Sequence, residues 1–383
     1  MKTLKISTLI ALSFLTFSCI AKEKNNKQEE KIALNIKRDK TTIKVALLLD
    51  TSNSMDGLID QAKAQLWKIV NELSYAKCEH VTPNLEIALY EYGNDALEKS
   101  DGYIRQVIGF SSDLDEISEK LFSLDTNGGS EYCGAVIKSS LKDLKWGKNK
   151  KDLNIIFIAG NEAFTQGNIS YQNIIADAVE KDITVNTIFC GDYQNGVSGK
   201  WKNAAKIGNG AYLTINQNKQ IVHVETPYDE IIIKWNKRLN KTYIRYGNHG
   251  VKKMRLQAVQ DDNAYGMDKE VVVARAVSKS SRVYNNASWD LVDAKKEKDF
   301  DYAKIDKSNL SKELQNMSTA ALKKYVEAQS VKRKEIQAEI QKINKQRKKY
   351  IAANSIKNSN KDELENVMLN AIKNQAKKKN YTW

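Results

Sequence analysis

Proline, histidine and cysteine are scarce in this chain of 383 residues. Only two prolines are present, which excludes a proline-rich linker or recognition segment. The histidines, His80, His223 and His249, are too far apart in the sequence to show a metal-binding spacing. Hydrophobic residues make up 41% of the chain and charged residues 28%, as in an ordinary globular protein. We therefore expect most of the chain to fold, as roughly two units.

Sequence motifs of catalysis are missing as well. The chain contains no nucleophile elbow, no phosphate-binding glycine loop and no zinc-binding His-Glu-x-x-His run. Its many carboxylates include no pair that the sequence alone places together, so no reaction class follows. We expect a binding or assembly protein and not an enzyme.

A secretory leader is present at the N-terminus. A short basic start precedes an uncharged apolar run over residues 6–17, and Ser18 stands directly before Cys19. This pattern is typical of a signal peptide over residues 1–19 and is too short for a membrane-spanning helix. A cleavage site that ends in cysteine resembles the lipobox of bacterial lipoproteins, in which Cys19 would be lipidated; an ordinary signal peptide is the alternative. Residues 20–41 are polar and predict a flexible tether.

The positive charge of the chain is concentrated near its C-terminal end. The formal net charge is +14, and residues 301–383 carry 19 Lys and Arg against 9 Asp and Glu. A basic surface attracts nucleic acid, acidic proteins or anionic lipid. Because an exported lipoprotein is separated from nucleic acid, we expect a protein partner, a membrane contact through the lipid anchor, and no nucleic acid. The expected location is the cell envelope, in the periplasm or at the outer membrane.

Apolar runs alternate with helical patterns between residues 43 and 215. Such alternation is typical of a doubly wound, mostly parallel α/β sheet of the Rossmann-like kind, flanked by helices. We expect one domain over residues 42–247, with a first helix over residues 57–75 and a closing helix over residues 229–246. The expected strands are residues 43–49, 85–92, 104–110, 153–159, 183–189 and 211–215.

Two further regions follow this domain. Residues 248–313 form a mixed extension of unknown role, in which residues 270–276 are expected to be a strand. Residues 314–383 predict a basic helical hairpin or coiled coil, because a long helix carries a heptad seam and a shorter amphipathic helix begins near Leu364. Gln329, Arg333 and Arg347 interrupt the seam. An antiparallel partner in the same chain is favoured over a second chain.

A group of oxygen-bearing side chains follows the first expected strand. Asp50, Ser52 and Ser54 form an Asp-x-Ser-x-Ser motif directly after an apolar run. A carboxylate and two hydroxyls are a suitable donor set for a hard cation such as Mg2+ or Ca2+, and the carboxyl end of a parallel sheet is where such ligands are presented. Helix capping is the alternative role for these residues. The motif resembles the metal-ion-dependent adhesion site of the von Willebrand factor A family.

Two more loops are compared with this family over residues 42–245. Ser130 stands where the family's glycine-led second loop brings a hydroxyl to the metal. The third loop of the family usually contains Thr-Asp-Gly, whereas this chain has Gly160, Asn161 and Glu162, so the aspartate is absent and Glu162 or Asn161 is expected to supply an oxygen. The resemblance implies Mg2+, Ca2+ or Mn2+ as the cofactor, with Asp50, Ser52, Ser54, Ser130 and Glu162 as ligands.

In this family the cation often keeps one coordination position for an acidic side chain of a protein partner. The resemblance therefore implies a partner surface beside the metal, to which Asn161 and Phe164 are expected to contribute. An envelope scaffold or assembly lipoprotein with a structural, metal-free domain is the alternative. Cys133 and Cys190 are expected at the same edge of the sheet, either as a disulfide or as reduced core cysteines.

Overall fold

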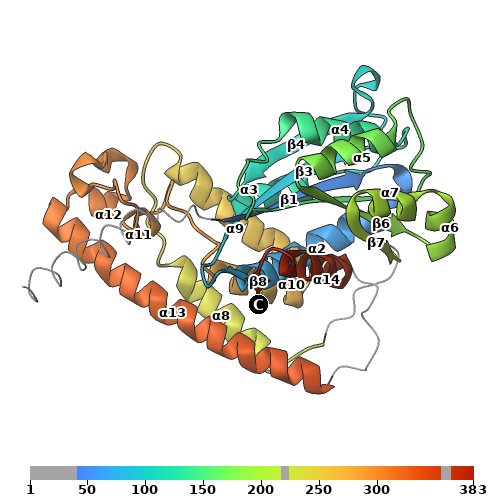
Figure 1. Ribbon diagram of the computed structural model, residues 1–383. Helices are drawn as coiled ribbons and strands as arrows, with labels where there is room; N and C mark the ends of the chain where they lie inside the picture. The colour runs from blue at the N-terminus through green and yellow to red at the C-terminus, as the bar shows by residue number, and fades with distance from the viewer. Residues whose placement is uncertain (1–40, 217–223, 355–363) are drawn as a thin grey trace, which may run out of the picture. The chain divides into compact units, whose positions relative to one another are not determined.

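A computed structural model of the chain describes residues 41–216, 224–354 and 364–383 (Figure 1). The expected signal peptide with Cys19, and all but the last residue of the expected tether, lie outside the described residues. In the described part of the chain, no helix combines the length and the apolar character needed to cross a membrane.

A six-stranded sheet forms the centre of the fold. The strand order is β4-β3-β1-β5-β6-β7, with β4 antiparallel to β3 and the other neighbours parallel. The predicted mostly parallel α/β fold is confirmed, and each strand predicted between residues 43 and 215 matches to within two residues at each end. The strands are β1 (Thr42–Asp50), β3 (Asn84–Tyr92), β4 (Ile104–Ser111), β5 (Leu153–Gly160), β6 (Ile183–Cys190) and β7 (Asn209–Ile215).

Successive side chains of a strand point to opposite sides of the sheet, and in these strands the side chains on both sides are apolar. Both faces of the sheet are therefore apolar. In β1, Val45 and Leu49 pack into one core and Ala46 and Leu48 into the other. The second core is covered by α4 (Cys133–Asp143), α5 (Tyr171–Glu180) and α7 (Trp201–Ile207), as Figure 1 shows. The first core is covered by α2 (Asp56–Ser74), α3 (Leu114–Phe122) and α14 (Leu364–Lys377).

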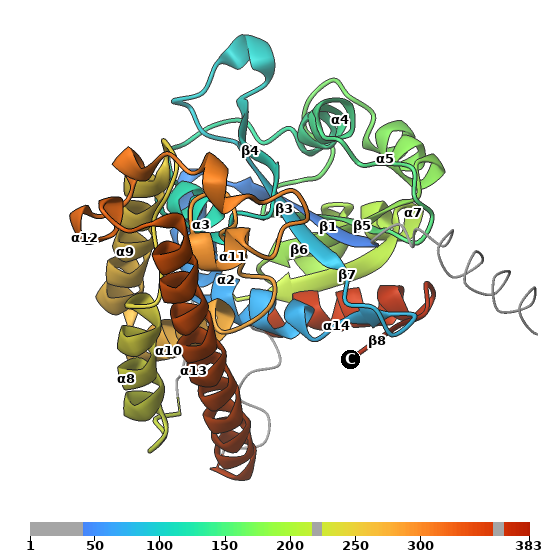
Figure 2. The same cartoon turned by 90° about the vertical axis from the view of Figure 1, so that its left-hand side faces the viewer.

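The helix that completes the cover of the first face comes from the end of the chain. Helix α14 packs against α2, β5 and β7, and the strand that follows it, β8 (Tyr381–Thr382), pairs with β2 (Lys77–Cys78). The expected closing helix lies elsewhere. Helix α8 (Asp229–Asn240) packs mainly against α10 (Lys269–Lys279) and α13 (Thr319–Asn354), and these three helices lie side by side in Figure 2.

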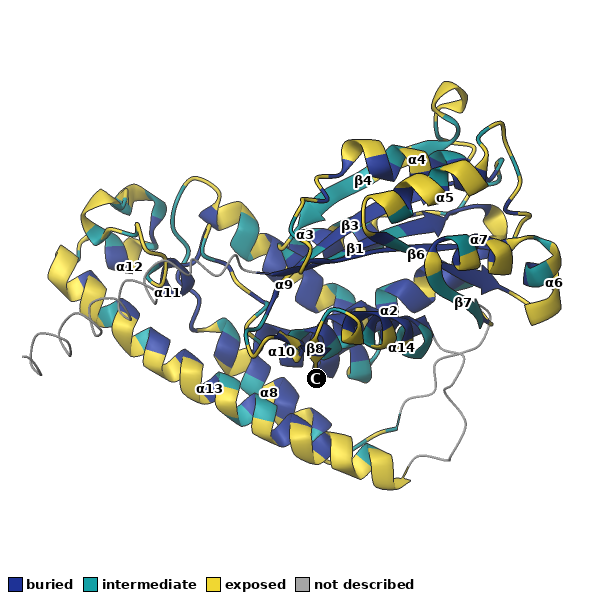
Figure 3. Ribbon diagram, in the orientation of Figure 1, coloured by how far each residue is buried: buried dark blue, intermediate teal, exposed yellow. Residues whose placement is uncertain are grey.

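The expected hairpin between the last two long helices is wrong, since α13 packs on α8, α10 and α11 (Leu291–Ala294), and α14 packs on the sheet domain. Most of the predicted heptad seam is buried, and Figure 3 shows the buried side of α13 facing its neighbours, but Gln329 is half-buried and Tyr350 is exposed. Two of its polar members are buried in ion pairs with earlier parts of the chain. Arg333 Nη1 lies 2.5 Å from Asp290 Oδ2, and Arg347 Nε lies 2.6 Å from Asp229 Oδ1.

The expected strand over residues 270–276 is also wrong, because these residues belong to α10. Its sequence is rich in valine, but all residues from Val271 to Lys279 are buried, so this helix is buried on every side and its apolar run does not differ from that of a buried strand. Asp268 caps this helix by accepting a hydrogen bond from the Val271 N–H at 3.0 Å.

The remaining elements are η1 (Asn53–Met55), η2 (Lys99–Asp101), α6 (Tyr193–Ser198), α9 (Gly250–Met267), η3 (Tyr302–Lys304), η4 (Lys307–Asn309) and α12 (Lys312–Gln315).

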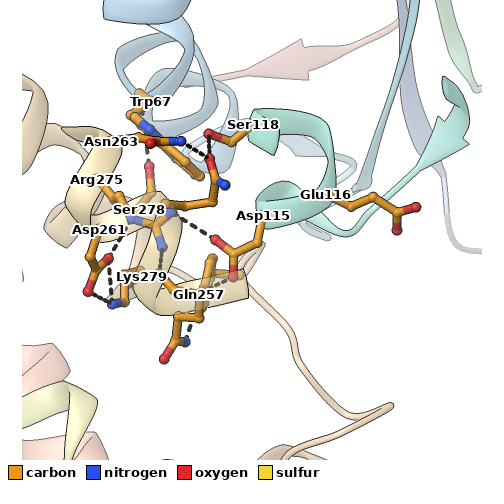
Figure 4. A network of polar contacts seen from close by, with 12 residues as sticks. Trp67, Asp115, Glu116, Ser118, Gln257, Asp261, Asn263, Arg275, Ser278 and Lys279 are labelled. Atoms are coloured by element: carbon orange, nitrogen blue, oxygen red, sulfur yellow. Dashed lines mark hydrogen bonds and ion pairs between the residues drawn. The ribbon is translucent and has the colours of Figure 1, made fainter. Parts of the chain in front are cut away.

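A buried ion network joins α3 of the sheet domain to α9 and α10 (Figure 4). The Arg275 guanidinium contacts Asp115 at 2.8 Å and Asp261 at 2.5 Å, and Lys279 Nζ contacts Asp261 at 2.8 Å. Burial opposes ionisation of Asp261, but the charges of Lys279 and Arg275 outweigh it and lower the pKa of this carboxyl to about 2. The sheet domain and the later helices therefore form one packed unit, and the expected divisions after residues 247 and 313 do not separate independent domains.

Replacement of Asp261 should destabilise this unit strongly. The variant Asp261→Asn leaves Lys279 buried without a counter-charge and removes one of the two partners of Arg275. We expect a loss of about 3–5 kcal/mol in the free energy of unfolding, measured by urea denaturation. The matched control is Asp262→Asn, the exposed next residue in the same helix, which should change stability by less than about 0.5 kcal/mol. Equal effects of both variants would contradict a supporting role for the network.

Candidate metal centre

The Asp50 carboxyl lies at the end of the central strand and is fully buried. Its Oδ1 accepts a hydrogen bond from the Ser52 N–H at 2.8 Å, while its Oδ2 is buried without a hydrogen-bond partner. The turn after β1 is held in place because the Thr51 N–H donates to the Tyr92 carbonyl at 2.9 Å. The strand therefore ends in a fixed turn with one carboxylate oxygen still lacking a partner.

The two serines of the first loop lie together and contact the third loop. Ser52 Oγ and Ser54 Oγ are 3.3 Å apart, and Asn161 Nδ2 donates to Ser54 Oγ at 3.0 Å. Asn161 Oδ1 is buried and has no hydrogen-bond partner. The first and third loops thus bring two hydroxyls, an amide oxygen and the Asp50 carboxylate to one edge of the sheet.

The second loop is held against the first by its backbone. The Asn127 N–H donates to the Thr51 carbonyl at 2.9 Å, and the Asp95 N–H donates to the Gly128 carbonyl at 2.5 Å. Gly129 fits tightly here, because an added Cβ would lie 2.5 Å from the Gly93 carbonyl oxygen. Ser130, which follows directly, is half-buried in this loop.

Sequence reasoning missed Glu131, the residue after Ser130. Its side chain is 5% exposed, and its carboxyl lies within hydrogen-bonding reach of the Asp50 carboxyl and the Ser52 hydroxyl. Burial raises the pKa of Asp50, and burial together with the nearby Asp50 raises the pKa of Glu131 to about 9. The only signal in the sequence was its position beside Ser130.

Two residues expected to act at the site, Glu162 and Phe164, lie in different surroundings. The Glu162 side chain is exposed, and its backbone carbonyl accepts a hydrogen bond from Trp201 Nε1 at 2.7 Å. Phe164 is 1% exposed, with its ring centroid 5.3 Å from that of Tyr171 and 4.9 Å from that of Trp201. Its expected role on the recognition surface is therefore wrong, because this aromatic ring is part of the core.

The alternative of a disulfide between Cys133 and Cys190 is also wrong. Both thiols are free and buried, and they belong to the cores on opposite faces of the sheet. Cys133 Sγ instead donates to Tyr92 Oη at 3.8 Å. Burial raises the pKa of both thiols, so they remain protonated core groups.

The donor set at this edge fits a hard divalent cation. The described residues contain no group of three or more His, Cys, Asp or Glu that could hold a metal by themselves. A cation here would depend on hydroxyl and amide oxygens as well as carboxylate, a mixture that Mg2+ and Ca2+ accept. The partnerless Asp50 Oδ2 and Asn161 Oδ1 are the atoms that such an ion would satisfy.

The family model of the von Willebrand factor type A domain matches residues 44–220, so the chain contains such a domain. Among solved structures, BatB from Bacteroides thetaiotaomicron is 17% identical, with 45% of this chain and 90% of that chain covered and a TM-score of 0.35. The SpRpn10 VWA domain is 13% identical, with 46% and 90% covered and a TM-score of 0.35.

Proximal thread matrix protein 1 from the mussel byssus, solved with a zinc-occupied MIDAS motif, is similar at 10% identity. The match covers 47% of this chain and 43% of that chain, with a TM-score of 0.35. No curated protein matches the chain.

Substitution of Gly160 should disturb the site and the fold together. A Cβ at this position would lie 2.6 Å from Tyr92 Oη and 3.0 Å from Asp50 Oδ2, both of which are buried. We expect Gly160→Ala to lower the free energy of unfolding by about 1–3 kcal/mol in urea denaturation. The control Gly266→Ala adds a methyl group to open space in α9 and should be neutral or stabilising by up to about 1 kcal/mol. A neutral Gly160→Ala variant would show that the carboxyl can move freely.

Proposed function

We propose that this protein is a bacterial cell-envelope lipoprotein whose von Willebrand factor A domain binds a protein partner through a divalent cation. The observation that carries the proposal is the buried, partnerless Oδ2 of Asp50 beside the hydroxyls of Ser52 and Ser54. A buried carboxylate oxygen without a donor is costly, and a bound cation would offset that cost. The domain acts in this proposal as a binding module and not as an enzyme.

Mg2+ is the proposed cofactor, with Ca2+ or Mn2+ as substitutes, because all available donors are oxygens. Asp50, Ser52, Ser54 and Ser130 would hold it, with Asn161 or Glu162 contributing from the third loop. When bound, the cation would offer a coordination position to an acidic side chain of the partner. The chain's own contribution is a set of donors that the sheet edge holds in place before binding, which reduces the cost of ordering them.

A metal-free scaffold is the second candidate, and one specific observation favours it. Asn161 stands in the third loop where the resemblance implies an aspartate, and its amide already donates to Ser54. In that case the partner would bind elsewhere on the chain. Dependence of partner binding on a divalent cation separates the two candidates.

Replacement of Asp50 should abolish cation binding with little loss of secondary structure. Asp50→Ala removes a carboxylate whose charge offsets the lost hydration of the ion, and Ser130→Ala removes only a neutral donor and should weaken binding less. Calorimetric titration with Mg2+ measures both. The full chain is required, because a fragment over residues 42–245 would lack α14, which covers one face of the sheet.

The matched control is Asp60→Ala, which removes an exposed carboxylate from α2 near the site and should leave Mg2+ binding unchanged. Circular dichroism checks the fold of each variant. If the unmodified protein takes up no Mg2+, Ca2+ or Mn2+ at millimolar concentration, even with solubilised envelope extract present, the scaffold replaces the adhesion site as the conclusion.

The proposed membrane anchor is tested at Cys19. Cys19→Ala removes the thiol that would carry the lipid, so we expect the variant to appear in the fraction released from membranes, whereas the unmodified protein sediments with them. The measurement is immunoblotting of both fractions after a high-salt wash, which removes contacts made only by the basic C-terminal residues. Retention of the variant on washed membranes would count against the lipoprotein.

A further inference from the structure

Two buried carboxyls meet at the candidate metal centre, and no basic side chain of the described residues forms an ion pair with either of them. Asp50 is fully buried and Glu131 is 5% exposed. The Ser52 hydroxyl and the neighbouring carboxyl lie within hydrogen-bonding reach of each acid. A pair of adjacent acids without a counter-ion is expensive to ionise in a protein interior.

Five other buried carboxylates have different surroundings. Each of the following acids is paired with a basic side chain at ion-pair distance, so the chain supplies counter-ions where they are needed for stability alone. The pairs are Glu91 with Arg105, Asp115 with Arg275, Asp229 with Arg347, Asp261 with Lys279, and Asp290 with Arg333. Asp50 and Glu131 form no ion pair with a basic side chain of the described residues, and they lie at the edge of the sheet where the metal site is proposed.

The close approach of the two acids is built into the backbone. Gly93 has a φ of +78°, and a Cβ there would lie 2.8 Å from Glu131 Cγ and 2.9 Å from Asp50 Oδ1. The bare glycine therefore leaves room for both carboxyls. Glu131 is held from the other side as well, because its backbone N–H donates to Gln166 Oε1 of the third loop at 3.2 Å.

We propose that Glu131 supplies the second negative charge of the cation site, in place of the aspartate that the third loop lacks. This inference rests on the proposed function and names a ligand that the sequence comparison did not. The second charge comes from the second loop, one residue after the Ser130 hydroxyl. A divalent cation beside Asp50 and Glu131 would offset the negative charge of both groups, which are otherwise unfavourable to ionise side by side.

Glu162 is the competing carboxylate, and its surroundings are less suitable. Its side chain is exposed, whereas those of Asp50 and Glu131 are buried. Water already solvates an exposed carboxylate, so its removal should change cation binding little. The two glutamates therefore form a matched pair for experiment, with the same chemistry at the same sheet edge and different burial.

The experiment is calorimetric titration of the full chain in detergent with Mg2+ alone, for the unmodified protein, Glu131→Gln and Glu162→Gln. We expect Glu131→Gln to raise the Kd for Mg2+ roughly 10- to 100-fold, and Glu162→Gln to change it less than about twofold. Thermal unfolding in chelator provides a second measurement. Without metal, Glu131→Gln should match or exceed the Tm of the unmodified protein, because the amide keeps the shape and hydrogen-bonding groups of the side chain and removes an acid whose ionisation beside Asp50 is unfavourable.

The outcomes separate this inference from the function on which it rests. If the unmodified protein binds Mg2+ and Glu131→Gln binds it equally well, Glu131 is not a ligand and the adhesion site stands without it. Loss of binding in Glu162→Gln alone assigns the second charge to Glu162 and also overturns the inference. A Tm drop of Glu131→Gln in chelator, matched by Glu131→Ala, would show that the side chain is structural. No binding by the unmodified protein would refute the proposed function itself.

Discussion

A sheet that is apolar on both faces must be covered on both, and this constraint organises the rest of the molecule. One face is covered by α4, α5 and α7, which follow the strands in order along the chain. The other is covered by α2 and α3 from the first half of the chain and by α14 from its end. Strand β1 is central and buried on both sides. Its last residue, Asp50, therefore lies in the interior, at the edge of the sheet where the loops meet. The candidate site is therefore buried at this edge because helices cover both faces of the sheet.

The helices after the sheet domain are joined to it by charge as well as by apolar packing. Arg333 and Arg347 interrupt the heptad seam of α13, yet each meets a carboxylate on an earlier segment. In α10, Arg275 likewise forms an ion pair with a carboxylate of an earlier segment, Asp115. Buried ion pairs contribute little net stability compared with apolar packing, but a displaced partner is strongly unfavourable, so such pairs favour one register over its neighbours. The absence of a basic partner at Asp50 and Glu131 is meaningful against this background.

The strands could be predicted from the sequence because each is an apolar run bounded by turns, and the Asp-x-Ser-x-Ser motif followed the first of them. The valine-rich stretch of α10 was misread because a helix buried on every side has no amphipathic period. Phe164 is expected on the surface because its loop lies beside the proposed metal, whereas its contacts, Tyr171 and Trp201, come from later helices. Glu131 was not recognised because its approach to Asp50 depends on Gly93 and Gln166, which only tertiary structure brings near.

The pairing of the last strand with β2 has a consequence for how the protein is made. Cys78 Sγ donates to the Lys379 carbonyl across 301 residues of chain, and β8 closes the small sheet beside it. Contacts of such long sequence separation form late, because the entropy of a very large loop must be overcome before they are gained. The sheet domain begins near the N-terminus, yet its first core stays open until the final helix has been synthesised. A prematurely terminated chain would thus present an apolar sheet face to solvent, and quality-control proteases and chaperones recognise such faces.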